Sequence, residues 1–227
     1  MTPIEAFADR ETLMDAAAEA LVGAVRQVPA PALAVSGGKT PGPVFDRLSA
    51  RDLTWERINV TLTDDRFVEP TSPESNEHLV RQRLLVGKAA RAPFVALKGA
   101  GPTPEADAAA AETRIRAILP FAAVLLGMGP DGHVASLFPG GSKLGVGLDF
   151  EGERLVIGVD DAADPPRVPR ISLTARALVT TNLLVMLVAG DEKRAVIERI
   201  ASNLDYAPPA ASFLRQDRCP LRVLWAP

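Results

Sequence analysis

An aspartate and a histidine lie two residues apart in a glycine-rich segment, GMGPDGHVASLFPG, at residues 127–140. The histidine, His133, is one of only two in the chain. A histidine can accept a proton near neutral pH, and a carboxylate such as Asp131 can orient the ring or raise its basicity. The alternative is a histidine that only fills a helix N-terminus. The glycines around the pair favour a general base.

A second polar segment, SGGKTP at residues 36–41, follows the apolar run PALAV at residues 31–35. Its two glycines, Gly37 and Gly38, let the backbone approach an anion closely, and the next helix would point free N–H groups at the same place. Ser36 and Thr40 add hydroxyl donors. A turn capped by threonine explains this segment alone equally well. The spacing matches neither a Walker P-loop nor a dinucleotide-binding fingerprint, so a nucleotide is not implied.

Three cations also come close to predicted strands. Arg66 ends the run Thr63-Asp64-Asp65-Arg66 after the strand predicted at 58–62. An arginine held by a carboxylate at a strand end can meet an anionic oxygen, although such a run is usually a solvated turn or a helix cap. Arg170 and Lys193 are expected just after strands, and either could instead complement surface acids. Lys193 near a helix start opposes the helix dipole, a mismatch that a bound anion would remove.

Short apolar runs alternate with helical periodicity along the whole chain, and these elements must position the polar segments. The patterns predict strands at 31–35, 58–62, 94–97, 122–126, 154–159, 183–188 and 221–225, and helices at 4–28, 43–48, 75–85, 103–119 and after residue 190. Strands that are apolar throughout and interleaved with helices predict an α/β fold with a mostly parallel sheet covered on both faces. Because ligands bind beyond the carboxyl ends of such strands, we expect the polar segments to meet there.

Composition excludes several classes of protein. The 227 residues carry a formal charge of −3 and are 47% hydrophobic, which is typical of an ordinary globular protein without general affinity for nucleic acid. A single cysteine, Cys219, excludes an intrachain disulfide and a cysteine-based zinc site. Two histidines and no clustered carboxylates argue against a catalytic metal. Without a membrane-span or signal-peptide pattern, we expect a cytoplasmic protein. The proline-rich stretches 161–170 and 206–210 are interpreted as surface connections within one domain, residues 1–227.

Taken together, the segments resemble the 6-phosphogluconolactonase family, within the larger group that includes glucosamine-6-phosphate deaminase and ribose-5-phosphate isomerase. The resemblance covers essentially the whole chain. Its motifs, in order, are SGGKTP (36–41), TDDRFVEPTSPESN (63–76), GMGPDGHVASLFPG (127–140), RISLT (170–174), GDEK (190–193) and PAASFLR (209–215). It implies a Rossmann-like α/β fold and hydrolysis of 6-phospho-D-glucono-1,5-lactone to 6-phosphogluconate, in the oxidative pentose phosphate pathway. It implies neither a metal nor an organic cofactor.

The resemblance also implies roles for individual residues. His133 matches the base that activates water, Asp131 lies beside it, and Arg66 matches the arginine near the lactone. The positions matched to substrate or phosphate binding are Ser36, Gly37, Gly38, Thr40, Asp64, Arg170 and Lys193. Three positions depart from the family pattern: Asp65 replaces a more frequent Glu, Pro130 a frequent acid, and Val134 a frequent Thr. None of these departures removes a proposed catalytic group.

Two other functions fit parts of the pattern. An amino-sugar-phosphate deaminase/isomerase would carry a glutamate in the loop after the histidine, whereas residues 134–139 read VASLFP and contain no acid. A non-catalytic sugar-phosphate-binding domain of a transcription regulator would need a DNA-binding module, and the chain shows no basic segment before its first predicted helix. We therefore expect an enzyme whose partner is a small phosphorylated sugar lactone. We expect it to be a monomer or weak homo-oligomer, without nucleic-acid or membrane partners.

Overall fold

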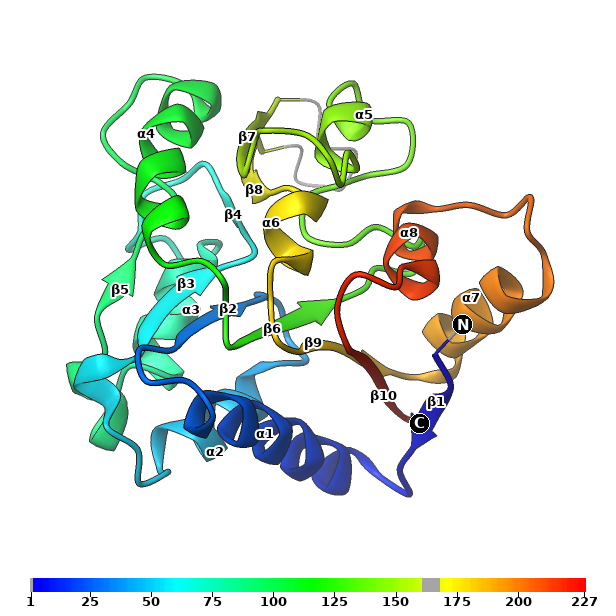
Figure 1. Cartoon of the computed structure of the whole chain (residues 1–227), viewed down its shortest axis with the longest axis horizontal. Coiled ribbons are helices and arrows are strands. Elements are labelled where there is room, and N and C mark those ends of the chain that lie inside the picture. Colours follow the sequence, from blue (N-terminus) through cyan, green and yellow to red (C-terminus); the bar gives the residue numbers. More distant parts are fainter. Residues whose placement is uncertain (1, 161–167) are drawn as a thin grey trace.

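In the computed structural model, which describes residues 2–160 and 168–227, the central element is a seven-stranded sheet (Figure 1). All of its strand pairs are parallel. The strand order is β1 (Ile4–Ala6), β10 (Leu221–Ala226), β9 (Leu184–Ala189), β6 (Ala123–Gly127), β2 (Ala32–Val35), β3 (Asn59–Leu62) and β5 (Phe94–Val95). The chain moves outward from β2 in one direction and from β6 in the other. The order thus reverses between β2 and β6, where α/β sheets bind their ligands.

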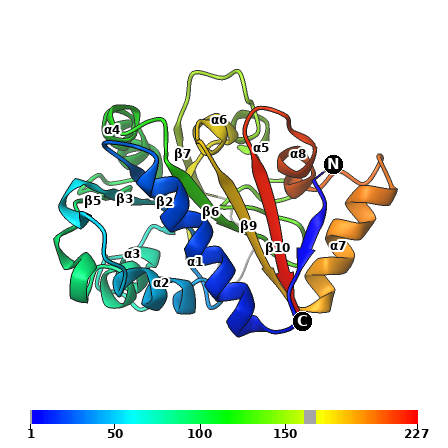
Figure 2. The ribbon, with the colours of Figure 1, turned by 60° about the horizontal axis from the view of Figure 1, so that its bottom comes forward.

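Helices cover both faces of this sheet, as the sequence pattern predicts. The larger ones are α1 (Arg10–Arg26), α2 (Gly42–Ser49), α3 (Asn76–Arg83), α4 (Pro104–Ala117), α7 (Asp191–Ser202) and α8 (Pro209–Arg215). Shorter ones are α5 (Leu144–Gly147) and α6 (Ala175–Val179), with 3₁₀ turns at Trp55–Arg57 and Gly87–Arg91. Figure 1 shows α1 and α2 below the central strands, α8 above them and α7 at the right, and Figure 2 shows α1 crossing in front of the sheet. Thr103 caps α4 as predicted, because its side chain accepts from the Ala106 N–H.

The helix predicted over residues 4–28 is too long at its start. Residues 4–6 form β1, which pairs with β10 at the edge of the sheet, and α1 begins only at Arg10. Asp9 sets that boundary, because its carboxylate accepts a hydrogen bond from the Thr12 N–H at 2.8 Å. A three-residue strand has no periodicity of its own, so only its pairing with the far end of the chain reveals it.

A second, antiparallel sheet corrects three further expectations. It consists of β4 (Asp64–Arg66), β8 (Arg170–Leu173) and β7 (Val156–Val159), in that order. The strand predicted at 154–159 therefore belongs to this sheet and not to the parallel one. Arg170 begins β8 and does not follow a strand, and Arg66 lies in a strand and not in a loop. Strands β4 and β8 pair across about a hundred positions of the chain, which local patterns do not encode.

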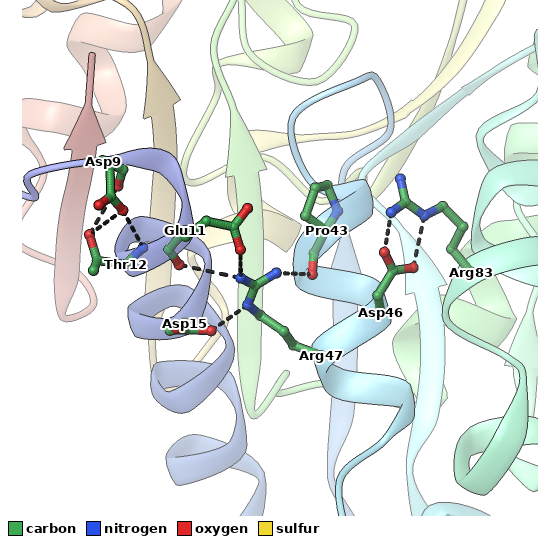
Figure 3. Close-up of polar contacts among 8 residues, drawn as sticks. All are labelled: Asp9, Glu11, Thr12, Asp15, Pro43, Asp46, Arg47 and Arg83. Carbon is green, nitrogen blue, oxygen red and sulfur yellow. Dashed lines mark hydrogen bonds and ion pairs between the residues drawn. The ribbon is translucent and has the colours of Figure 1, made fainter.

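Ion pairs on the outer surface join the first three helices (Figure 3). Arg47 of α2 pairs with Glu11 and Asp15 of α1, and Arg83 of α3 pairs with Asp46 of α2. Because α2 directly follows the SGGKTP segment, these contacts help to hold the helix that carries this segment.

The two proline-rich stretches have different outcomes. Residues 161–167 lie outside the described part of the chain. Residues 206–210 do connect α7 to α8, but Pro208 is buried and the Ala210 N–H donates to the Gly132 carbonyl at 2.9 Å. This connection therefore packs against the loop that carries His133. Among residues 2–160 and 168–227, none of the helices combines the length and apolar character needed to cross a bilayer.

Candidate active site

A cleft of about 250 Å³ lies at the carboxyl edge of the parallel sheet, beside the junction of β2 and β6. All of the predicted site residues except Asp131 line it: Ser36, Gly37, Gly38, Thr40, Asp64, Arg66, His133, Arg170 and Lys193. The fold brings these residues together from five separate parts of the sequence. The cleft is also lined by Lys39 and Asn76, to which the sequence reasoning assigned no role.

Asp131 reaches the cleft through His133. Its Oδ1 lies 2.6 Å from the histidine Nδ1 and accepts the His133 backbone N–H at 3.0 Å. A carboxylate in this position favours the tautomer with hydrogen on Nδ1, which leaves Nε2 as the basic nitrogen. The side chains of His133 and Asp131 are 22% and 46% exposed, so solvent reaches the pair. The ring also packs against Phe138, with the ring centroids 4.6 Å apart.

Gly129 is required for this arrangement. A Cβ at residue 129 would lie 2.2 Å from His133 Cε1 and 2.7 Å from Asp131 Oδ1, distances that real side chains do not allow. The Gly129 N–H also donates to the His133 carbonyl at 2.9 Å, which closes the loop. The glycines noted in the sequence therefore let the backbone pass directly beside the His133–Asp131 pair.

Arg66 and Arg170 lie directly opposite each other in the antiparallel pair of β4 and β8. Opposite residues of such a pair project to the same face, and like charges there destabilise the sheet. Both arginines line the cleft, and only 4% of the surface of Arg170 is exposed. Arg170 Nε donates to the Val168 carbonyl at 3.2 Å, and its guanidinium carbon lies 5.7 Å from the Phe138 ring centroid. An anion in the cleft would offset the repulsion between the two guanidinium groups.

Two lysines complete the positive lining. Lys193 is half-buried in the first turn of α7, and burial lowers the pKa of its ammonium group, while the charge of Glu192 opposes this shift. Within the described residues, Lys193 has no hydrogen bond or ion pair. Lys39 is exposed in the loop after β2. Lys39 lies within the SGGKTP motif, between the predicted site residues Gly38 and Thr40. This position could have identified it as a cleft residue.

Asp64 is the carboxylate that lines the cleft, and it is 7% exposed. Its Oδ2 accepts the Ser136 hydroxyl at 2.6 Å, and its Oδ1 accepts the Thr63 hydroxyl at 3.1 Å. Ala135, just before Ser136, has a φ of 48° in the left-handed region. This buried contact fixes the loop after His133 to β4. Ser136 was missed because one serine in a long motif carries no signal of its partner.

The second aspartate of the run, Asp65, points away from the cleft into the start of α3. Its carboxylate accepts hydrogen bonds from the Ser75 hydroxyl and from the N–H groups of Asn76 and Glu77. Burial raises the pKa of Asp65 to about 6, although these hydrogen bonds oppose the shift. Asp65 therefore anchors the start of α3. The sequence pattern allowed a carboxylate that holds the side chain of Arg66, and Asp65 does not make that contact.

The charges of the cleft suit an anionic ligand. Four cationic side chains and one buried carboxylate line it, in a chain whose formal charge is −3. Within the described residues, no three or more His, Cys, Asp or Glu side chains are grouped so that they could hold a metal ion. The arrangement combines a histidine base with an electropositive binding surface.

Comparisons with known proteins agree with these features. The family model described as glucosamine-6-phosphate isomerases/6-phosphogluconolactonase matches residues 8–225. The 6-phosphogluconolactonase of Caulobacter vibrioides is 47% identical over 231 residues, covering 99% of this chain and 98% of that protein. That of Rhizobium meliloti is 40% identical over 219 residues, covering 96% of this chain and 94% of that protein.

A solved structure agrees in fold as well as in sequence. The crystal structure of a 6-phosphogluconolactonase from Shewanella baltica superposes with a TM-score of 0.94 at 30% identity, covering 100% of this chain and 98% of that one. The match thus includes both sheets and the strand ends that form the cleft. On the family match and on relatives this similar along nearly their whole length, the chain belongs to the glucosamine-6-phosphate isomerase/6-phosphogluconolactonase family.

Proposed function

We propose that this protein is a 6-phosphogluconolactonase, which hydrolyses 6-phospho-D-glucono-1,5-lactone to 6-phospho-D-gluconate with water activated by His133. The observation that carries the proposal is the His133–Asp131 pair at the wall of a cleft lined by Arg66, Arg170 and Lys193. The relatives named 6-phosphogluconolactonase support the choice of substrate.

His133 acts as the general base. With Nδ1 hydrogen-bonded to Asp131, Nε2 takes a proton from water as the water oxygen attacks the lactone carbonyl carbon. Asp131 keeps the ring in this tautomer and stabilises the imidazolium that forms. The tetrahedral intermediate then collapses with cleavage of the bond to the ring oxygen. That oxygen receives the proton from the imidazolium, and the product carboxylic acid releases its own proton to solvent.

Arg66 stabilises the charge that develops on the carbonyl oxygen. A cation that faces the oxyanion lowers the barrier most when it is held in place before the reaction, because no reorganisation is then needed. Arg66 comes from β4, so its backbone is fixed by pairing with β8. Asp64, on the same strand, is assigned to the hydroxyl groups of the sugar, which can donate to its oxygens.

The phosphate group is bound at the opposite end of the substrate from the reacting carbonyl and serves to position it. Arg170 and Lys193 supply positive charge, and Ser36, Gly37, Gly38 and Thr40 supply hydroxyl and backbone donors ahead of α2. The lowered pKa of Lys193 fits this role, since a bound dianion would favour its charged form.

The test compares two substrates. Purified protein is incubated with freshly prepared lactone, with an enzyme-free blank at every pH because the lactone hydrolyses spontaneously, and separately with glucosamine 6-phosphate. We expect rapid hydrolysis of the lactone and no ammonia from the amino sugar. Ammonia release without lactone hydrolysis would instead identify an amino-sugar-phosphate deaminase. Binding of both compounds without turnover would identify a sugar-phosphate-binding domain.

A further inference from the structure

Asn76, the last residue of the motif at 63–76, has both ends of its side-chain amide engaged at the cleft. It is 4% exposed and is the first residue of α3. Its Nδ2 donates to the Asp64 carbonyl at 2.7 Å, and its Oδ1 accepts from Arg66 Nη1 at 2.9 Å. An amide offers a donor and an acceptor from one planar group, so the contact to Asp64 fixes the orientation in which Oδ1 meets Arg66.

The same amide lies directly against Gly37. A Cβ at residue 37 would lie 1.8 Å from Asn76 Oδ1 and 2.0 Å from its Cγ. The loop after β2 can take its position only because residue 37 has no side chain. One buried amide at the start of α3 therefore contacts two other segments of the cleft wall: the loop after β2 and strand β4.

The backbone of Asn76 is fixed independently of its side chain. Asp65 accepts the Asn76 N–H at 2.6 Å and the Ser75 hydroxyl at 2.9 Å, and the Ser75 side chain in turn caps α3. Asp65 also accepts the Arg66 N–H at 2.8 Å. One buried carboxylate therefore holds the backbones of both Arg66 and Asn76. The side chains of Arg66 and Asn76 thus meet from backbones that are held in place.

Within the described residues, Asn76 is the single hydrogen-bond partner of the Arg66 guanidinium. This partner is neutral. A carboxylate in the same place would hold the arginine equally well, but it would also neutralise the charge that the cleft presents. An amide orients Arg66 and leaves its positive charge available to an anionic oxygen.

We propose that Asn76 is the positioning residue for Arg66, which it holds, still fully charged, at the place where charge develops on the lactone carbonyl oxygen. This inference rests on the proposed function, because it assigns Asn76 to the step in which Arg66 acts. The hydrogen bond of Asn76 to a charged group predicts that Asn76→Ala lowers kcat by about 10- to 100-fold. KM changes little, because the contact matters most in the transition state.

A double-mutant cycle separates this role from a structural one. The lactonase kcat and KM are measured for the wild type, Arg66→Ala, Asn76→Ala and the double variant, together with thermal unfolding of each. If Asn76 acts through Arg66, removing it from the Arg66→Ala protein changes kcat by no more than about twofold. Loss of folded protein would lower kcat by the same factor in both backgrounds, so additive effects overturn the proposal.

Two more variants complete the experiment. Asn76→Asp keeps the shape but places a carboxylate on Arg66, and we expect a loss of kcat at least as large as that of Asn76→Ala. It also replaces Asn76→Ala in the cycle if that protein does not fold. Thr103→Ala removes the cap of α4, away from the cleft, and we expect it to lower the melting temperature without changing kcat.

The possible failures can be told apart. Wild-type kcat in Asn76→Ala, with Arg66→Ala impaired, overturns the positioning role alone and leaves the proposed function intact. Wild-type kcat in Arg66→Ala overturns both the positioning role and the assignment of Arg66 to the carbonyl oxygen. Wild-type activity in Asn76→Asp shows that the charge of Arg66 is not what the amide preserves, and it overturns the proposal.

Discussion

At the residue scale, the His133–Asp131 pair leads to the first prediction. His133→Ala removes the proposed base, so we expect kcat to fall by ~10²–10⁴-fold, the usual contribution of a positioned general base. Because the His133 side chain is 22% exposed and not part of the apolar core, the variant should stay folded. The measurement is the initial rate of lactone hydrolysis, corrected for the spontaneous rate.

Asp131→Asn is the companion variant. It keeps the size of the side chain but presents an amide to Nδ1, which permits the wrong tautomer of His133. We expect it to lower kcat as well, with less effect than His133→Ala. A folded His133→Ala protein with near-wild-type turnover would eliminate this residue as the base.

A second residue-scale prediction concerns the phosphate. Lys193→Ala removes a charge-assisted contact of roughly 1.5–3 kcal/mol, so kcat/KM for the phosphorylated lactone should fall by about one to two orders of magnitude. We expect a similar loss for Arg170→Ala. Hydrolysis of unphosphorylated gluconolactone should be slow in the wild type and little affected by either change.

The matched control is Lys88→Ala, since Lys88 lies outside the cleft lining and is 56% exposed. It should leave kcat/KM unchanged for both substrates. An equal loss on the phosphorylated and the unphosphorylated lactone in Lys193→Ala would rule out a phosphate contact.

At the element scale, the start of α3 gives a pH-dependent prediction. The pKa of Asp65 is about 6 in the folded protein and ~3.9 in an unfolded chain. The folded state therefore binds this proton more tightly. The stability that results is fully present below pH ~3.9 and is lost as the pH rises through about 6. The difference in pKa corresponds to about 3 kcal/mol.

Urea unfolding of the wild type and of Asp65→Asn, between pH 4 and pH 7, measures this effect. The asparagine does not titrate, so the free energy of unfolding of the wild type should fall relative to that of the variant by about 2 kcal/mol between pH 4 and pH 7. Titrations elsewhere in the protein cancel in this difference. A difference between the two proteins that stays constant over this range would contradict the burial of an ionisable Asp65.

Helix α2 shows which contacts position the loop after β2. Its ion pairs to α1 and α3 lie at the surface, where each such pair contributes only about 0–1 kcal/mol. Its apolar face is fully buried at Val44, Phe45 and Leu48, and the burial of one such side chain stabilises by about 1.5–3 kcal/mol. The position of α2 thus depends mainly on packing, and the ion pairs add orientation.

At the scale of the whole molecule, we propose that residues 1–227 form one domain. Thr63 joins the two sheets: its N–H donates to Val35 of β2 at 3.0 Å, and its carbonyl accepts from Leu173 of β8 at 2.8 Å. The contact between Asp64 of β4 and Ser136 adds a link to the loop that follows β6. Neither sheet can separate without exposing these buried groups.

We therefore expect a single cooperative unfolding transition in calorimetry, with a ratio of van't Hoff to calorimetric enthalpy near ~1. Near-ultraviolet circular dichroism of Trp55 and Trp225 should follow the same midpoint as the far-ultraviolet signal, which reports both sheets. Two resolved transitions would show that the antiparallel sheet unfolds separately, and the assignment of one domain would be wrong.

The sequence by itself was sufficient for the features that depend on local pattern. Apolar runs predicted every strand of the parallel sheet except β1 within a few residues, because a strand buried on both faces is apolar throughout. Thr103 and Pro104 predicted the start of α4, since capping depends on neighbours in the chain. The polar segments at the strand ends predicted the lining of the cleft, because parallel strands bring their carboxyl ends to one edge.

Only the tertiary structure decided the contacts between distant segments. The strands β1, β4 and β8 are short, so no periodicity marks them, and the pairs β1–β10 and β4–β8 join segments that lie far apart along the chain. The opposition of Arg66 and Arg170 follows from that pairing, whereas the place of the Asn76 amide against Gly37 follows from the packing of the start of α3 against the loop after β2. Local patterns record which face of a segment is apolar, whereas the identity of its neighbour is set by how all the elements pack together.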